Sequence, residues 1–420
     1  MTDHLGPTPA EADRLRWARA PEWFRPDYAR AITGVFPTVF ETLGHPTGPF
    51  RSLSGVLPAA SPRRAKRVFL LCLDGLGFKE LARSRRLQEL HGTYGSWLTS
   101  VFPTITSCAL TSIYEGLPPA RHGILGHQIW KDFPGAVVDM LRMQVLGAEE
   151  PLLASGFDVR GWKREPGLLE SEWSRDVACY HLMANHIVGS GLSALVYGNT
   201  PLVGFADPLE GLTKAGRMLR DLESGWVGLY LPVVDTLGHA LGGDTPQVGL
   251  ALRHLEESLA WMVEGLPSEV VAETAFAVTT DHGQNPIRET LPLHGAPWTW
   301  LERHTRAVGF SGRVMHVYLG GHDAAEVAGW LADFVGPAGR VFPFDEAKEL
   351  TGEIVAEERV RESLGDLVVV LQDGFNWDRH GPDPAAGPYA TRLTSQHGAL
   401  TWDELFVPFL LAPLDALRID

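Results

Sequence analysis

A hydroxyl-rich helix start is the first stretch of this chain that could do chemistry. Residues 97–130 read WLTSVFPTITSCALTSIYEGLPPARHGILGHQIW, in which an apolar strand pattern ends near Pro103 and a short helical pattern follows over about 107–114. Thr104, Thr106 and Ser107 stand together at this junction. A helix N-terminus leaves backbone N–H groups unpaired, so it suits an anion such as phosphate. We predict that Thr106 is a nucleophile there, with the Thr104 hydroxyl as the alternative.

Three apolar runs that each end in an aspartate form the second candidate. They are residues 67–74 (RVFLLCLD), 226–235 (WVGLYLPVVD) and 275–281 (AFAVTTD). Each run is typical of a strand buried on both faces of a parallel sheet. His239 follows Asp235 by four residues, and His282 follows Asp281 directly. A single Asp after a strand is usually a turn or cap residue.

The aspartates and histidines become informative as a set. Parallel strands deliver their ends to one edge of a sheet, and carboxylates gathered there raise one another's pKa unless a cation neutralises them. Spacing of four residues places Asp235 and His239 on one side of a helical turn, where both can hold one metal. His397, in the segment TSQHG, could supply another imidazole. We therefore predict a metal site with mixed oxygen and nitrogen ligands.

Five motifs together resemble the alkaline phosphatase superfamily, and specifically its nucleotide pyrophosphatase/phosphodiesterase branch (type I phosphodiesterases). In the family's order they are LCLDG, FPTITS with HGILGH, VVDTLGHALGG, TTDHG and TSQHG, and the resemblance covers about residues 66–130 and 193–411. It implies two divalent metal ions, most often Zn²⁺, although Asp/His sites also accept Mn²⁺. It also implies a hydrolase that cleaves phosphodiester or pyrophosphate bonds in small molecules through a phospho-threonine intermediate.

The resemblance assigns roles to individual positions. One metal would be held by Asp74, Thr106, Asp281 and His282, and the other by Asp235, His239 and His397. The family's nucleophile precedes a Gly by ten positions, as Thr106 precedes Gly116, which favours Thr106 over Thr104.

Two positions expected to touch substrate depart from the family's pattern. Ser107 stands where nucleotide-cleaving members carry an aromatic residue, and His127 stands where an Asn commonly contacts a phosphoryl oxygen. His127 could donate the same hydrogen bond or act as an acid near the leaving group, or it could be an ordinary loop residue. No Arg closely follows Thr106, which favours diesters over monoesters. A phosphomonoester or phosphonate hydrolase and a noncatalytic metal-binding protein are the alternative functions.

The elements that position these residues alternate between strand and helix. Residues 247–264 have helical spacing between two of the Asp-ended strands, and further strands are expected at 193–197, 314–319, 367–371 and 405–411. We predict an α/β fold, a doubly wound and largely parallel sheet with helices on both faces plus a small inserted α+β lobe. The expected segments are an N-terminal extension packed on the core (1–54), the metal-binding core (55–130, 191–307 and 366–420), a cap insertion (131–190) and the lobe (308–365).

Composition narrows the class of protein. The chain has 420 residues, of which 45% are hydrophobic and 21% charged, and its net charge is −15. An acidic chain disfavours nonspecific binding to nucleic acid or to an anionic membrane surface. Three scattered cysteines argue against a disulfide framework, and no apolar run approaches the roughly 20 residues of a membrane span. The first residues lack a secretory signal pattern, so we expect a cytoplasmic protein, with its oligomeric state open.

Overall fold

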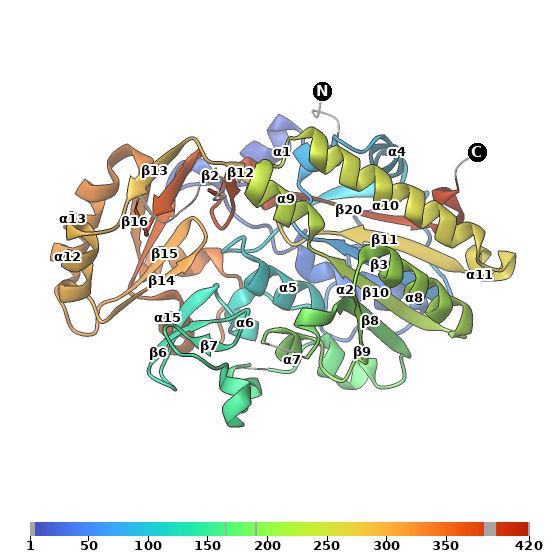
Figure 1. The fold of residues 1–420 in the computed structure, drawn as a ribbon, viewed down its shortest axis with the longest axis horizontal. Coiled ribbons are helices and arrows are strands. Elements are labelled where there is room, and N and C mark those ends of the chain that lie inside the picture. Colours follow the sequence, from blue (N-terminus) through green and yellow to red (C-terminus); the bar gives the residue numbers. More distant parts are fainter. Residues whose placement is uncertain (1–4, 164, 190, 382–391, 419–420) are drawn as a thin grey trace.

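A seven-stranded sheet lies at the centre of the computed structural model, which describes residues 5–163, 165–189, 191–381 and 392–418 (Figure 1). All of its strands run in one direction except β20, which is antiparallel to both neighbours. In spatial order they are β4 (Gly95–Thr99), β20 (Phe406–Pro413), β11 (Thr274–Thr279), β3 (Arg67–Leu73), β10 (Gly225–Leu231), β8 (Cys179–Ala184) and β9 (Leu202–Phe205).

Helices cover both faces of this sheet. They include α8 (Pro208–Asp221) and α10 (Pro246–Glu264) on one face and α2 (Val35–Leu43) and α5 (Thr106–Glu115) on the other. Side chains of a strand alternate between faces. On β3, Phe69 and Leu71 accordingly belong to the core that includes α8 and α10, whereas Val68 and Leu70 belong to the core that includes α2 and α5. The predicted doubly wound α/β fold is confirmed.

A second, antiparallel sheet forms a lobe beside the first (Figure 1). Its strands, in spatial order, are β14 (Ala307–Ser311), β15 (Val314–Tyr318), β17 (Leu367–Leu371) and β16 (Gly339–Pro343). On β17, Val369 packs into the lobe's own core with α13 (Ala324–Val335), while Val368 packs into the main core. The lobe is therefore joined to the main domain by a shared apolar layer.

Two sequence-based element predictions are wrong. Residues 193–197 were expected to form a strand, but Ser193–Val196 form the short helix α7. A brief apolar run cannot be distinguished from a buried helical turn by its pattern alone. The strand expected over 226–235 ends at Leu231, and α9 (Val233–Leu241) begins after Pro232. Proline has no N–H to donate to a sheet, so the strand ends there and Asp235 lies on a helix.

The observed sheets cross the predicted segment boundaries at two places. β8, inside the expected cap segment 131–190, pairs with β10 and β9 in the central sheet. β17, inside the expected core segment 366–420, pairs with β15 and β16 of the lobe. The cap segment also supplies most of a small antiparallel sheet, formed by β5 (Gln128–Lys131), β6 (Ala136–Asp139) and β7 (Gln144–Val145). The division of the chain into folding units stays a prediction.

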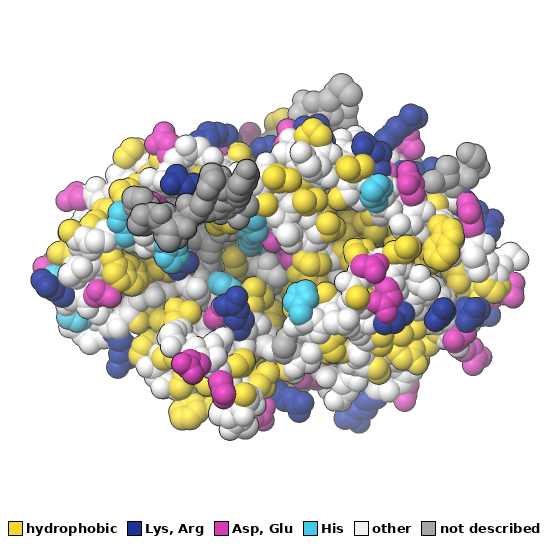
Figure 2. All heavy atoms as spheres, viewed as in Figure 1, with side chains coloured by type: hydrophobic (Ala, Val, Ile, Leu, Met, Phe, Trp, Pro, Cys, Tyr) yellow, Lys and Arg dark blue, Asp and Glu magenta, His cyan; other side chains and the backbone are white. Residues whose placement is uncertain are grey.

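The molecular surface carries both signs of charge, interspersed over the face seen in Figure 2. Histidine side chains gather on this face around a hollow near the middle of the molecule (Figure 2). None of the helices in the described ranges has the length and apolar character needed to cross a membrane.

Candidate active site

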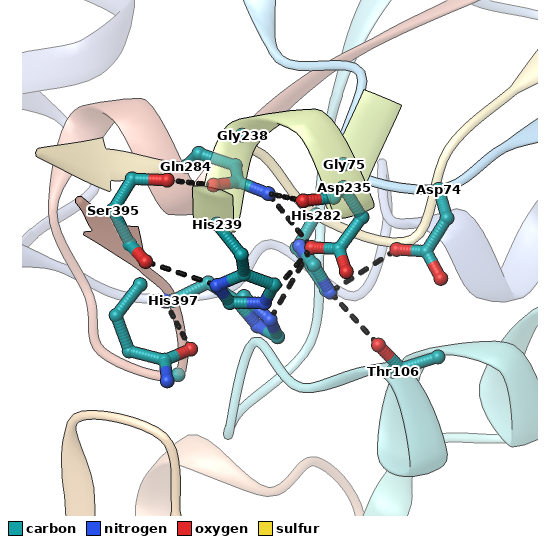
Figure 3. Close-up of polar contacts among 12 residues, drawn as sticks. Asp74, Gly75, Thr106, Asp235, Gly238, His239, His282, Gln284, Ser395 and His397 are labelled. Atoms are coloured by element: carbon teal, nitrogen blue, oxygen red, sulfur yellow. Dashed lines mark hydrogen bonds and ion pairs between the residues drawn. The ribbon is translucent and has the colours of Figure 1, made fainter. Parts of the chain in front are cut away.

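Six acidic and imidazole side chains meet at the carboxyl edge of the central sheet (Figure 3). Asp74 follows β3, and Asp281 lies just beyond the neighbouring parallel strand β11, so both carboxylates reach the same edge. Asp235 and His239 lie one helical turn apart on α9. We call the set the Asp–His cluster; its members are Asp74, Asp235, His239, Asp281, His282 and His397.

Short distances connect the members of the Asp–His cluster. His282 Nε2 lies 3.1 Å from Asp281 Oδ2 and 3.6 Å from Asp74 Oδ1. Asp235 Oδ1 lies 3.3 Å from His239 Nε2 and 3.6 Å from His397 Nε2. The rings of His282 and His397 stack with their centroids 3.5 Å apart. The sequence predicted all six residues, and the structure brings all six together.

The histidines of the cluster turn their Nε2 atoms toward the carboxylates. Their Nδ1 atoms lie close to backbone carbonyls: His239 at 2.9 Å from Ser395 O, His282 at 3.1 Å from Gly283 O and His397 at 2.9 Å from Thr104 O. A carbonyl can only accept a hydrogen bond, so each Nδ1 carries the proton in that contact. This tautomer leaves the Nε2 lone pair free, which is the form in which an imidazole binds a metal.

Two subsets of the cluster have the spacing of metal ligands. Asp235, His239 and His397 form one, and Asp74, Asp235 and His282 form the other; within each subset the ligand atoms lie within 4.8 Å of one another. Asp74 Oδ1 and Asp281 Oδ2 are buried without a hydrogen-bond partner. Burying such an oxygen unsatisfied is costly, and a cation would satisfy it. The donor set therefore fits divalent cations.

The crowding of buried acidic and imidazole groups shifts the pKa values of the cluster. Burial raises the pKa of Asp74 well above its usual value, and the Asp281 and Asp235 carboxylates raise it further. Burial also lowers the pKa of His397 well below its usual value, helped by the charges of His282 and His239. A bound cation would favour the ionised form of Asp74 and would require the neutral form of His397.

Outer contacts hold the cluster's carboxylates in place. The Gln284 amide donates to Asp235 Oδ1 at 2.7 Å, and the Ser395 hydroxyl in turn donates to Gln284 Oε1 (Figure 3). The Tyr230 hydroxyl donates to Asp74 Oδ2. Sequence reasoning gave Gln284 only a role in shaping its loop and gave Tyr230 none, because Tyr230 stands inside an apolar strand with no motif around it.

Thr106 is the hydroxyl that faces the cluster. It is the first residue of α5, and its Oγ1 lies 3.1 Å from His282 Nε2 (Figure 3). The Thr104 hydroxyl is occupied elsewhere, since it donates to Ala399 O at 2.8 Å and accepts from Gly398 N at 3.0 Å. The geometry thus favours Thr106 over Thr104 as the nucleophile.

Ser107 does not contact the cavity, contrary to the sequence-based expectation. Its side chain is buried, and its hydroxyl donates to Gly126 O at 2.8 Å. Its register one residue after Thr106 suggested exposure, but the helical turn points it toward the backbone of the loop that precedes His127. Ser107 therefore ties α5 to that loop.

His127 lies in the loop before β5 and lines the same cavity as Thr106. Its Nε2 is 3.8 Å from Asp139 Oδ2, and its Nδ1 is buried without a hydrogen-bond partner. Burial lowers the pKa of His127, although Asp139 acts in the opposite direction. The backbone N–H of His127 donates to the Ser311 hydroxyl at 2.9 Å. His127 is thus a neutral imidazole near neutral pH, placed beside the Asp–His cluster.

A cavity of about 530 Å³ opens beside the cluster and corresponds to a hollow lined by histidine on the face of Figure 2. Part of its wall is Thr106, Asp235, His239 and His397. Another part is aromatic and basic, formed by Phe310, Trp377 and Arg379. Sequence reasoning missed Phe310 and Arg379, because neither stands in a motif and both reach the cavity from the lobe side of the fold.

The fold and the site together define the class of protein. A largely parallel sheet with helices on both faces carries the Asp–His cluster at its carboxyl edge, with a helix-start threonine beside it. The family model for type I phosphodiesterase / nucleotide pyrophosphatase matches residues 68–384. The chain belongs to this family, which consists of metal-dependent phosphoester hydrolases.

Solved structures share this fold. Murine ectonucleotide pyrophosphatase/phosphodiesterase 5, an inactive variant in complex with AMP, matches with a TM-score of 0.60 at 16% identity, over 83% of this chain and 88% of that one. The human protein matches with a TM-score of 0.57 at 16% identity, over 82% and 87%. Phosphonoacetate hydrolase from Sinorhizobium meliloti 1021, in complex with phosphonoformate, matches with a TM-score of 0.57 at 19% identity, over 86% and 97%. No curated protein sequence matched the chain.

Proposed function

We propose that this protein is a two-metal phosphodiesterase or nucleotide pyrophosphatase that acts through a phospho-Thr106 intermediate. One observation carries the proposal: the Thr106 hydroxyl, at a helix N-terminus, lies 3.1 Å from an imidazole of the Asp–His cluster. Membership of a phosphoester hydrolase family supports the reaction type. The structure similar to this chain that holds AMP shows a phosphate ester bound by the same fold.

One proposed set of metal ligands equals the first subset of the cluster. The other takes Asp74 and His282 from the second subset and adds Asp281, whose Oδ2 lies 3.1 Å from His282 Nε2. Asp235, His239 and His397 would hold one cation, and Asp74, Asp281 and His282, with the Thr106 oxygen, would hold the other. Mixed carboxylate and imidazole ligands suit Zn²⁺, with Mn²⁺ as the alternative. When bound, such cations lower the pKa of a nearby hydroxyl and neutralise charge on phosphoryl and leaving-group oxygens.

The chain's own groups account for the remaining steps. Thr106 Oγ1 attacks phosphorus, the bond to the leaving oxygen breaks, and water later hydrolyses the phosphothreonine. Backbone N–H groups in the first turn of α5 have no intrahelical partner and would stabilise the phosphoryl oxygens. His127, which shares the cavity with Thr106, would donate a further hydrogen bond to the phosphoryl group.

Phosphonate hydrolysis is the second candidate function. A phosphonoacetate hydrolase is among the structures that share this fold, and the match spans 97% of its length. The cavity beside Thr106 contains Arg379, a cation suited to a charged substrate, whereas no arginine follows Thr106 closely in sequence to grip a dianionic phosphoryl group. A diester or phosphonate is therefore favoured over a simple monoester.

Hydrolysis assays with paired substrates test the proposal. The purified protein is assayed with bis-p-nitrophenyl phosphate and with p-nitrophenyl phosphate, before and after addition of zinc. We expect zinc-dependent turnover with preference for the diester. Thr106→Ala should lower kcat by at least about a thousandfold, because the nucleophile is gone, while Thr106→Ser should retain measurable turnover.

The metal content of the same variants separates a lost nucleophile from a lost site. Thr106→Ala should keep most of its zinc, since Asp74, Asp281 and His282, the other proposed ligands of that cation, remain. Undiminished turnover in Thr106→Ala would refute the nucleophile, and absence of turnover on every ester in the zinc-loaded wild-type protein would support a noncatalytic metal-binding protein.

A further inference from the structure

Arg379 is a cation in the cavity wall that takes no part in the bond-breaking steps proposed above. It follows β18 (Phe375–Asp378) directly and lines the cavity that Thr106 also lines. Its guanidinium carbon lies 4.5 Å from the centroid of the Phe310 ring, and its Nη1 donates to Gln128 Oε1 at 3.1 Å. Two contacts on different elements thus fix the position of this side chain.

The charge of Arg379 has no partner within the described part of the chain. No carboxylate of residues 5–163, 165–189, 191–381 and 392–418 lies within ion-pair distance of its guanidinium. The adjacent Asp378 accepts instead from Gly381 N at 2.8 Å and lies 3.7 Å from His294 Nε2. A guanidinium has five N–H donors, so after the bond to Gln128 most of them remain available to an anion.

The position of Arg379 indicates which part of a substrate it would meet. Its contacts are with Gln128, the residue after His127, and with Phe310 of the lobe, and none is with a member of the Asp–His cluster. The hydrogen bond to Gln128 places the guanidinium on the His127 side of the cavity. A phosphoryl group seated at Thr106 would therefore extend toward Arg379 through its leaving group or other substituent.

We propose that Arg379 recognises a second anionic group on the substrate, a carboxylate or a second phosphoryl, attached to the phosphorus that Thr106 attacks. The substrates would then be anhydrides or phosphonates that carry a further negative charge, rather than diesters of two neutral alcohols. The inference rests on the proposed function for the position of the reacting phosphorus. The guanidinium supplies specificity, because its planar N–H groups pair with two oxygens of such a group.

Binding of three small probes tests the inference. Methylphosphonate has one anionic group, phosphonoacetate adds a carboxylate, and methylenediphosphonate adds a second phosphoryl. Each is titrated calorimetrically into zinc-loaded protein that carries Thr106→Ala, so that no probe is turned over. Arg379→Gln in this background should weaken the binding of one or both doubly anionic probes by about tenfold, as expected for a charged hydrogen bond at an accessible site. It should change the affinity for methylphosphonate by less than about twofold. Arg379→Lys should give an intermediate loss.

The arms of the experiment separate the sources of the second charge. A loss of affinity confined to phosphonoacetate identifies a carboxylate as the group that Arg379 recognises. A loss of affinity confined to methylenediphosphonate identifies a second phosphoryl group. Chelation of zinc by the probes is the same in every variant, so the comparison between variants cancels it. Arg306→Gln is the matched control, because Arg306 also stacks on an aromatic ring, that of Trp130 at 5.0 Å, but lines a different hollow; it should keep the parent affinities.

Three results would overturn the inference. The first is an equal loss of affinity for all three probes in Arg379→Gln, and the second is an unchanged affinity for all three. The third is a loss of affinity in Arg392→Gln instead, since Arg392 lines the same cavity. Hydrolysis of bis-p-nitrophenyl phosphate by the wild-type protein is measured separately. Turnover without Arg379-dependent binding would refute the inference alone, and Arg379-dependent binding in a protein without turnover would refute the proposed function alone.

Discussion

The hydrogen bonds of individual histidines distinguish the proposed metal ligands from the other imidazole in this site. His239, His282 and His397 each direct Nδ1 to a carbonyl and leave Nε2 free within the cluster. His127 lacks such a bond at Nδ1, and its Nε2 lies 3.8 Å from Asp139, too far for a hydrogen bond. Its Nε2 is therefore available to contact a substrate, and the metal subsets do not include it.

Replacement of His127 separates its two proposed roles. Burial lowers its pKa, so little of it is protonated near pH 7, and we expect it to donate a hydrogen bond rather than to act as an acid. His127→Ala should lower kcat/KM by about 10- to 100-fold, and His127→Asn, which keeps an N–H donor and does not titrate, should restore most of it. Steady-state rates for bis-p-nitrophenyl phosphate between pH 6 and 9 measure this.

The pH dependence of the rates shows whether His127 acts as a hydrogen-bond donor or as an acid. If His127→Asn is as inactive as His127→Ala, and one side of the bell-shaped pH dependence of kcat/KM is absent in it, His127 acts as an acid rather than as a hydrogen-bond donor. Wild-type rates in His127→Ala would show that the residue contributes to neither.

Residue types and spacing sufficed to predict the members of the Asp–His cluster but not the residues that support them. Asp235 and His239 stand four residues apart, a spacing that places both side chains on one side of a helix. Gln284 and Tyr230 support the cluster only because the fold brings β10, α9 and the loop after β11 together. Their hydrogen bonds depend on tertiary contacts between residues distant in sequence, and no local pattern records such contacts.

At the scale of elements, the hairpin of β14 and β15 holds the loop that carries His397. The backbone N–H of Arg313, in the turn between β14 and β15, donates to His397 O at 2.9 Å. The Arg313 side chain is fully buried and pairs with the equally buried Glu404 at 2.5 Å. Glu404 Oε1 accepts from Ala399 N at 2.9 Å. The pair thus fixes the loop from both sides.

Removal of one member of this pair should destabilise the protein strongly. Arg313→Met leaves the Glu404 carboxylate buried without its partner, so we expect the free energy of unfolding to fall by about 3–5 kcal/mol. Arg313→Met combined with Glu404→Leu should recover much of that loss, because no unpaired charge remains. Urea unfolding followed by tryptophan fluorescence measures both variants; a loss below about 1 kcal/mol in the single variant would show that water or a neighbour satisfies Glu404.

Apolar runs in the sequence predicted the central strands well. The strand β8 was missed because polar residues interrupt its apolar run. β3 and β11 are almost continuously apolar and were expected with nearly correct ends. β8 reads CYHLMA, and no strand was expected there. In the structure His181 is buried and stacks on Tyr197 with ring centroids 4.4 Å apart. A histidine that packs as an aromatic ring gives no hydrophobic signal in the sequence.

At the scale of the whole molecule, bound metal should contribute to stability. Asp74, Asp235 and Asp281 lie close together, and their mutual repulsion is relieved only partly by neighbouring imidazoles. A ligand that binds only the folded state at a hundredfold excess over Kd adds about 2.7 kcal/mol. Dialysis against a chelator should therefore lower Tm by at least about 3 °C, and two equivalents of zinc per chain should restore it.

Metal titration of a single variant provides the control. Asp235 belongs to both ligand subsets, so Asp235→Asn should bind fewer equivalents of zinc and should show a smaller change in Tm on chelation. A Tm unaffected by chelation in the wild-type protein, with no zinc detected in the restored sample, would contradict a metal site at this cluster.

The shared apolar layer between lobe and main domain has a consequence for how this protein can vary. The β14–β15 hairpin contributes Phe310 beneath Arg379, Ser311 to the backbone of His127 and Arg313 to the loop of His397. A change in this hairpin thus reaches the cavity wall and the loop of His397 at once. Exchange of the lobe for that of a relative should therefore alter the shape of the cavity and the position of His397 together.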